Sequence, residues 1–127
     1  RLRTVTGVQT CALPILLNGG ELEGVRLLKP ETVALMTTNQ VGDLKVDAGI
    51  HGDGFGYGFG VVTDRAGPRA PDASAVGSYG WGGMFSTLFW VDPQRQLIGV
   101  LMTQIYPSAH LKLREEFQQR TYQALVP

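Results

Sequence analysis

The sequence predicts an α+β fold in which helices pack on an antiparallel sheet. The main observation is a pair of runs rich in β-branched, aromatic and aliphatic residues, Met84–Val91 and Gln96–Ile105. The short polar segment between them, Asp92–Arg95, contains a proline that suits a turn, so the two runs predict a hairpin. Both faces of the first run are apolar, so we expect both to be covered, one of them by helices.

The N-terminal part predicts the end of a helix followed by a small hairpin. Leu16–Gly20 ends in Asn-Gly-Gly, and Asn or Gly supplies the left-handed residue that caps many helices. Glu21–Leu28 has Glu-Gly between two short apolar pairs, which indicates a tight turn between two short strands.

A second helix is expected to begin at Pro30, because proline suits the first turn and Glu31 complements the positive end of the helix dipole. We expect this helix to end near Gln40 to Gly42. Its expected apolar face consists of Val33, Leu35, Met36 and Val41.

The middle of the chain predicts a strand over Phe55–Asp64, flanked by loops over Gly42–Asp53 and Ala66–Ala75. In such a strand the larger side chains share one face and the glycines share the other: Tyr57, Phe59 and Val61 against Gly56, Gly58 and Gly60. A bare glycine face would allow a helix or a ligand to come close.

The C-terminal part predicts one long helix over Ala109–Leu125, with Ser108 as its N-cap. The expected buried stripe is Leu113, Phe117, Thr121, Ala124 and Leu125. The expected exposed stripe is Arg114, Glu115, Gln118 and Gln119, and His110 in the first turn is expected at the surface.

Composition excludes several function classes. The chain has 127 residues, which is the length of one domain, and its 11 Lys and Arg balance its 11 Asp and Glu. A formal net charge of zero provides no basic field for nucleic acid. No apolar run is long enough to span a membrane. The single cysteine, Cys11, excludes an intrachain disulfide.

A whole pattern of residues resembles a known family. Gly-Trp-Gly-Gly at Gly80–Gly83, a strand that ends in Phe89–Pro93 and a following aliphatic strand are similar to the C-terminal part of serine hydrolases of β-lactamase fold. This superfamily includes class C β-lactamases, D,D-peptidases and esterases. The glycine-rich Phe55–Gly60 resembles the strand that precedes the family's third motif. The resemblance covers roughly residues 16–126 and implies a truncated, C-terminal portion of the β-lactamase/transpeptidase-like fold.

The resemblance also implies a site. The family's third motif is Lys-Thr-Gly or His-Thr-Gly, and by position Trp81-Gly82-Gly83 stands in its place, lining one wall of the substrate cleft. The backbone N–H of Met84 would then contribute to the oxyanion hole. Tyr79 is expected to line the cleft as well. The alternative is structural: the glycines form a strand bulge and Trp81 is a core aromatic residue.

Tryptophan at position 81 bears on the substrate. Lys or His there can bind a substrate carboxylate, whereas Trp cannot form that ion pair. The Trp-Gly-Gly version resembles the esterase branch, in which an apolar acyl or alcohol group can lie against the ring. The resemblance therefore implies acyl transfer from a small-molecule ester or amide through an acyl-enzyme, with no metal or organic cofactor.

The family's other two motifs do not occur in this chain. Ser-x-x-Lys is missing, because the serines at Ser74, Ser78, Ser86 and Ser108 have Gly, Trp, Phe and Leu three residues later. Tyr-x-Asn is missing as well. We expect the chain to carry no catalytic side chain and to be inactive alone. The alternatives are a fragment of a D,D-peptidase or class C-like β-lactamase, or a non-catalytic binding module of the same fold.

Val5–Ile15 resembles translated sequencing adapter in assembled metagenomic genes and lacks a signal-peptide pattern, so we expect residues 1–15 to be an artefact or non-native arm and residues 16–127 to be the hydrolase segment. A natural N-terminal arm is the alternative.

Family resemblance favours the bacterial periplasm or exterior. His51, Asp47 and Asp53 match no metal-ligand spacing, so a loop is expected there and no metal site.

Overall fold

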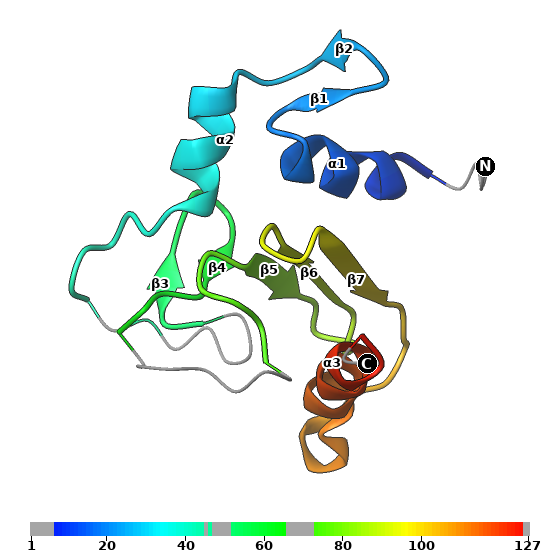
Figure 1. Cartoon of the computed structure of the whole chain (residues 1–127). Coiled ribbons are helices and arrows are strands. Elements are labelled where there is room, and N and C mark those ends of the chain that lie inside the picture. The colour runs from blue at the N-terminus through cyan, green and yellow to red at the C-terminus, as the bar shows by residue number, and fades with distance from the viewer. Residues whose placement is uncertain (1–6, 45, 47–51, 66–72, 126–127) are drawn as a thin grey trace.

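An antiparallel sheet flanked by helices is the centre of the fold. The structure is a computed structural model that describes residues 7–44, 46, 52–65 and 73–125. Within these residues the main sheet has five strands in the order β3-β4-β5-β6-β7, and β1 and β2 form a separate pair. Figure 1 shows α1 and α2 on one side of the main sheet and α3 on the other, which confirms the α+β class. The bounds are α1 Gly7–Leu17, β1 Glu21–Leu22, β2 Val25–Arg26, α2 Pro30–Thr37, β3 Gly54–Phe55, β4 Gly60–Val61, β5 Tyr79–Gly82, β6 Leu88–Asp92, β7 Leu97–Leu101 and α3 Leu113–Gln123.

The predicted hairpin is confirmed as β6 and β7, but both strands are shorter than expected. Trp90 lies opposite Gly99, and the connection between the strands covers residues 93–96. β6 begins at Leu88 instead of Met84, because the chain turns sharply where Ser86 adopts a left-handed φ of 67°. The N–H of Ser86 donates to the carbonyl of Gly83 over 3.1 Å, which closes this turn between β5 and β6.

The two faces of β6 pack into different parts of the core, as the alternation of its side chains predicted. Val91 belongs to a cluster that reaches α1 and α2 on one side of the sheet: Leu13, Leu16, Val33, Val61, Tyr79 and Val91. Leu88 and Trp90 pack with Tyr122 of α3 on the other side. Each large apolar side chain buried in this way contributes roughly 1.5–3 kcal/mol. The expectation that both faces are covered is confirmed.

The first helix and the small hairpin also agree with the sequence. Gly19 and Gly20 have left-handed φ values of 65° and 98°, and the N–H of Gly20 donates to the carbonyl of Ile15 over 2.7 Å. β1 and β2 pair antiparallel around a turn at Glu23 and Gly24. α1 passes through the expected boundary at residue 16, and the assignment of residues 1–15 to a non-native arm stays a prediction.

The second helix begins at Pro30 as predicted, but it ends at Thr37, several residues early. Its last carbonyls find partners outside the helix, since the side chain of Gln40 donates to the carbonyl of Leu35 over 3.0 Å and the N–H of Tyr57 donates to that of Met36 over 3.0 Å. Leu35 is 52% exposed, so its expected place on the buried face is wrong.

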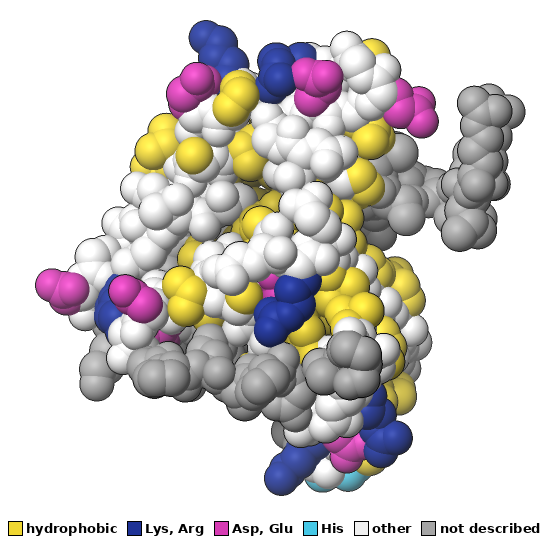
Figure 2. Space-filling model, in the orientation of Figure 1, with side chains coloured by type: hydrophobic (Ala, Val, Ile, Leu, Met, Phe, Trp, Pro, Cys, Tyr) yellow, Lys and Arg dark blue, Asp and Glu magenta, His cyan; other side chains and the backbone are white. Residues whose placement is uncertain are grey.

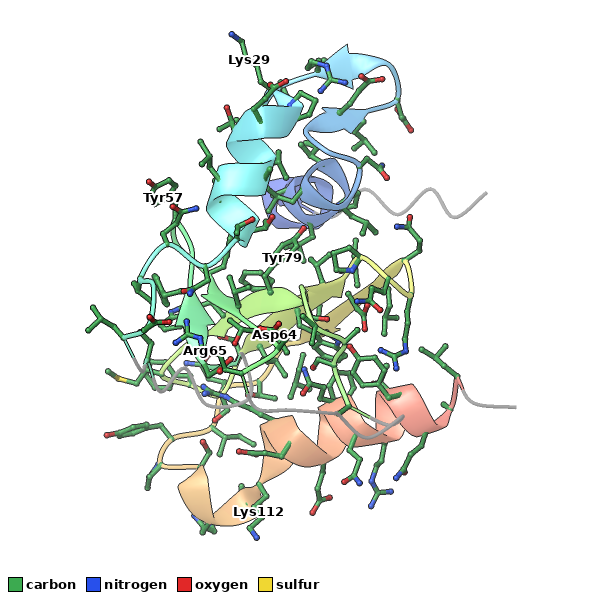
Figure 3. The ribbon with its side chains drawn as sticks, turned by 60° about the vertical axis from the view of Figure 1, so that its left-hand side comes forward. Lys29, Tyr57, Asp64, Arg65, Tyr79 and Lys112 are labelled. Atoms are coloured by element: carbon green, nitrogen blue, oxygen red, sulfur yellow. The ribbon has the colours of Figure 1, made fainter. Side chains whose placement is uncertain are left out.

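The single strand expected over Phe55–Asp64 is wrong. The segment forms two short strands, β3 and β4, which pair with each other around a tight turn. Gly58 has a φ of 94°, and the N–H of Gly56 donates to the carbonyl of Phe59 over 2.9 Å, so the glycines serve the turn. Tyr57 is 58% exposed at the tip, as Figure 3 shows. The loops expected over 42–53 and 66–75 lie partly outside the described residues.

The long C-terminal helix expected over Ala109–Leu125 is interrupted. A short 3₁₀ helix, Ala109–Leu111, is followed by Lys112 with a left-handed φ of 46°, and α3 begins only after it. Ser108 donates no capping bond; its hydroxyl contacts that of Ser86 instead. Of the expected buried stripe, Phe117 packs against the cluster of Leu88, Trp90 and Tyr122, whereas Ala124 and Leu125 are exposed. Tyr122, outside that stripe, is the buried residue of α3. None of the helices in the described part of the chain is long and apolar enough to cross a membrane.

Two core tyrosines predict a loss of stability at alkaline pH. Burial raises the pKa of Tyr79 to about 12, and burial together with the charge of Asp92 raises that of Tyr122 to about 12. A phenol whose folded pKa is raised contributes stability that is complete below its unfolded pKa near 10 and is lost as the pH rises towards the folded value. Between pH 9 and pH 11, the free energy of unfolding should therefore fall by about 1 kcal/mol less in Tyr79→Phe than in the wild type. Urea denaturation at both pH values measures this, and equal losses would contradict it.

Candidate functional site

Trp81, the tryptophan of the Trp81–Gly83 segment, lies near the C-terminal end of β5 and is partly exposed. β5 pairs with β4 and β6, and Trp81 stands opposite Phe89. The Trp81 side chain is 41% exposed, and its ring meets that of Phe55 edge-on, with centroids 5.2 Å apart and planes at 88°. Trp81 is thus held by a neighbouring aromatic residue while much of its surface stays accessible.

Two cavities meet at Gly82 and Gly83. The first has a volume of about 720 Å³ and a mostly apolar lining contributed by α1, β5, β6 and the end of β7; it includes Leu13, Leu16, Trp81, Phe89 and Met102. The second has a volume of about 680 Å³ and a more polar lining, which includes Ser86, Tyr106, Ser108, Lys112 and Arg114. Because both glycines line both cavities, they form the wall between them.

Close packing explains why glycine occupies both positions. A Cβ at Gly82 would lie 3.1 Å from the carbonyl oxygen of Thr87 and 3.3 Å from the guanidinium of Arg114. A Cβ at Gly83 would overlap the hydroxyl of Thr87. The backbone here is also fixed, since the N–H of Gly83 donates to the carbonyl of Thr87 over 3.0 Å. Any larger side chain would therefore shift the wall.

The backbone amide of Met84 is the open donor of this wall. Among the described residues, no acceptor is paired with the Met84 N–H, and the Met84 side chain is 72% exposed. Met84 lines the more polar cavity next to Gly83. A backbone N–H that faces no internal acceptor at the edge of a cavity is available to a ligand oxygen.

The structure places Tyr79 away from the cavities. Tyr79 is 3% exposed and packs against Phe59, with ring centroids 5.6 Å apart. Figure 3 shows it between the sheet and the two N-terminal helices. Tyr79 and Trp81 share one face of β5, but the helices cover only the first of them. The structure therefore brings together Trp81, Gly82, Gly83 and Met84, and leaves Tyr79 in the core.

Arg114 is the site residue that the sequence pattern missed. It was expected on the exposed stripe of the last helix, yet its guanidinium lies against Gly82 and its Nη2 donates to the carbonyl of Gly83. Helical periodicity missed it because the buried face of α3 is centred on Tyr122, and positions 114 and 118, one and two turns earlier on that side, are half-buried.

Charged side chains of both signs are mixed on the face of the molecule that Figure 2 shows. Figure 2 shows Lys and Arg close to Asp and Glu at both the top and the bottom of the view. Within the described residues, no three His, Cys, Asp or Glu side chains come together as metal ligands. Asp53, from the loop considered above, accepts hydrogen bonds from Thr63, with 2.8 Å between Oγ1 and Oδ1. Asp47 and His51 lie outside the described residues.

Comparison with known proteins identifies relatives of the chain. Protein Rv1367c of Mycobacterium tuberculosis (strain ATCC 25618 / H37Rv) is 32% identical over 134 residues, and the uncharacterized protein MT1414 of strain CDC 1551 / Oshkosh matches to the same extent. The match covers 87% of this chain but 33% of each relative, so the chain spans about a third of the length of these curated relatives.

A family model described as Beta-lactamase matches residues 5–123, which is most of the chain and includes the whole of the wall described above. The match also includes the part of α1 that precedes residue 16. The antiparallel sheet with helices on both faces agrees with such a fold. The chain belongs to the beta-lactamase family.

Proposed function

We propose that this chain supplies one wall of the acyl-binding cleft of a serine hydrolase that cleaves esters, or amides, through an acyl-enzyme. The observation that carries the proposal is the N–H of Met84, which has no acceptor in the described part of the chain and lies beside the glycine wall where two cavities meet. Family membership supports a serine hydrolase, and the apolar cavity beside Trp81 supports an uncharged acyl or alcohol group.

The proposed chemistry assigns each part of the wall a task. A serine outside this chain attacks the carbonyl carbon, and the carbonyl oxygen becomes an oxyanion. The Met84 N–H donates to that oxygen, and a preorganised donor of this kind contributes roughly 3–4 kcal/mol to transition-state stabilisation. The intermediate collapses to an acyl-enzyme as the alcohol leaves, and water then releases the acid. Trp81 provides apolar contact for the substrate.

The nucleophile and its base are proposed to lie in a longer protein. The chain contains no Ser-x-x-Lys and no Tyr-x-Asn, and it spans about a third of the length of its relatives. Turnover is therefore expected from the longer protein, while the chain alone is expected to be inactive. A D,D-peptidase or class C-like β-lactamase is the second enzyme candidate, and a binding module without a nucleophile is the candidate from another class.

A tryptophan exchange tests the ester assignment. In the longer protein we expect hydrolysis of p-nitrophenyl butyrate with an initial burst of p-nitrophenol, because acylation of the serine releases p-nitrophenol before a slower deacylation. Trp81→Lys should lower kcat/KM for this neutral ester and raise kcat/KM for an ester that carries a carboxylate, each by roughly 10-fold, because the ammonium can pair with the carboxylate.

Tyr57→Lys serves as the matched control, since it introduces the same charge at an exposed residue that lines neither cavity. It should leave both substrates unaffected. Hydrolysis of penicillins or peptidoglycan-type peptides in preference to both esters would favour the second enzyme candidate. Binding of esters without any turnover by the longer protein would favour the binding module and exclude the hydrolase.

A further inference from the structure

Arg114 makes an unusual contact for a residue in the first turn of a helix. Its Nη2 donates to the carbonyl oxygen of Gly83, a residue 31 positions earlier in the chain. Its guanidinium also lies against Gly82, where a Cβ would come within 3.3 Å of Cζ and Nη1. The side chain thus joins α3 to the glycine wall.

The carbonyl of Gly83 and the N–H of Met84 belong to the same peptide group. This group is planar and trans, so its C=O and N–H point in opposite directions. A donor that holds the carbonyl on one side therefore sets the direction of the N–H on the other. The second donor to this carbonyl is the N–H of Ser86, which lies within the same turn. Of these two donors, only Arg114 comes from a separate element of the fold, and only Arg114 carries a charge.

The contact also polarises the amide. A guanidinium at a carbonyl oxygen is a charge-assisted hydrogen bond, which is stronger than a neutral one and draws electron density away from the peptide nitrogen. The Met84 N–H becomes a better donor as a result. Strength and direction are the two properties that an oxyanion-hole donor requires.

The surroundings hold the arginine in place at some cost. The Nε of Arg114 is buried and has no hydrogen-bond partner among the described residues. Lys112, two residues earlier, adopts a left-handed φ of 46°, which redirects the chain at the start of α3. Figure 3 shows Lys112 at the N-terminal end of α3, below the sheet. Arg114 follows this break and reaches the Gly83 carbonyl from the first turn of α3.

We propose that Arg114 is a positioning residue that fixes the Gly83–Met84 peptide and thereby aims and strengthens the Met84 N–H. The catalytic use of that amide rests on the proposed function; its orientation by Arg114 does not. One measurement, of the Met84 amide, tests its orientation by Arg114, and a second, of turnover, tests its catalytic use.

The first measurement follows the amide by NMR. The chain contains three methionines, Met36, Met84 and Met102, so labelling with ¹⁵N-methionine gives three backbone signals from it. Arg114→Met adds a fourth signal, from the new methionine at position 114; it should shift or broaden the Met84 signal and leave those of Met36 and Met102 unchanged. Arg114→Lys adds no signal and should restore that of Met84 in part. Met84→Leu assigns the signal. A Met84 signal that is unchanged in Arg114→Met overturns the proposal.

The matched control is Arg120→Met, which removes the same charge from the same helix. Arg120 has a side chain that is 79% exposed and lies 3.7 Å from Glu116. This variant adds a signal of its own from position 120 and should leave the three native methionine signals in place. If Arg120→Met moves the Met84 signal as much as Arg114→Met does, the effect is one of overall charge and the proposal is overturned.

The second measurement uses ester hydrolysis by the longer protein. Arg114→Met should lower kcat roughly 10- to 100-fold with KM changed less than about threefold, because the amide acts on the transition state. Added guanidinium should restore part of kcat, which a merely structural role would not do. An active wild type with unchanged kcat in Arg114→Met overturns the catalytic consequence. An inactive wild type in which Arg114→Met still moves the Met84 signal refutes the proposed function and leaves the positioning role supported.

Discussion

Replacing Asp92 by alanine is expected to lower the free energy of unfolding by about 3–5 kcal/mol, the usual result of breaking a buried charged network. The Asp92 carboxylate is fully buried. It accepts hydrogen bonds from the Nη1 of Arg95 over 2.9 Å and from the hydroxyl of Tyr122 over 3.0 Å. The Tyr122 hydroxyl in turn accepts from the indole N–H of Trp90 over 3.0 Å.

The position of this network explains the size of the expected loss. Asp92 ends β6, Arg95 lies in the turn to β7, and Tyr122 comes from α3. The guanidinium of Arg95 also lies 5.0 Å from the centre of the Tyr122 ring. Without the carboxylate, the Tyr122 hydroxyl loses its acceptor and a buried space opens between sheet and helix. The second cluster of the core, which contains Trp90, would loosen with it.

Trp90 fluorescence measures the effect during urea denaturation. In a Trp81→Phe background, Trp90 is the remaining tryptophan of the chain, so the signal reports this cluster directly. Asp64→Ala is the control, because Asp64 is exposed and should change stability by less than about 0.5 kcal/mol. Equal unfolding free energies for the Asp92 and Asp64 variants would show that the network contributes nothing.

The same carboxylate predicts a response to acid. Burial alone would raise the pKa of Asp92, but hydrogen bonds from Arg95, Tyr122 and the N–H of Ala75 outweigh it and hold the pKa below its usual value. A carboxyl with a depressed folded pKa contributes stability that is present above its unfolded pKa, near 4, and is lost as the pH falls through the folded value. The stability of Asp92→Asn should therefore depend less on pH below about 4 than that of the wild type.

The sheet could be predicted because its signal is local. Side chains alternate along β6 with a period of two, so a run that is apolar on both faces requires cover on both faces whatever lies elsewhere in the chain. The turn at Ser86 and the break at Lys112 are different. Both residues have left-handed backbones without being glycine, and the hydroxyl of Ser86 contacts that of Ser108, 22 positions later. Sequence propensity alone does not indicate such positions.

The candidate site could be predicted only in part, for a related reason. Alternation places Tyr79 and Trp81 on the same face of β5, and this much follows from the sequence. Which of them reaches the cleft depends on where the helices over that face end. Tyr79 lies within the first core cluster, whereas Trp81 extends past it into the apolar cavity. Arg114 reaches the same wall from the opposite face, through a helix whose start the sequence misplaced.

Gly99→Ala is expected to destabilise the fold by about 3 kcal/mol, the upper part of the range for overpacked cores. Gly99 lies directly opposite Trp90 in the β6–β7 hairpin, and a Cβ there would overlap the Trp90 ring. The ring has little room to move. Phe117 meets it edge-on with centroids 5.8 Å apart, and its N–H is fixed to Tyr122. Urea denaturation measures the loss.

A double-mutant cycle distinguishes this clash from a general effect of alanine in the strand. Trp90→Leu removes the ring atoms that a Cβ at position 99 would meet, so Gly99→Ala should cost less than about 1 kcal/mol in that background, a coupling of about 2 kcal/mol. Val100→Ala, at the neighbouring half-exposed position of β7, should cost less than about 1 kcal/mol. If the losses of unfolding free energy for Gly99→Ala and Trp90→Leu add to within about 0.5 kcal/mol, the direct contact is contradicted. Coupling would show that glycine at position 99 leaves the space that the Trp90 ring occupies between β7 and α3.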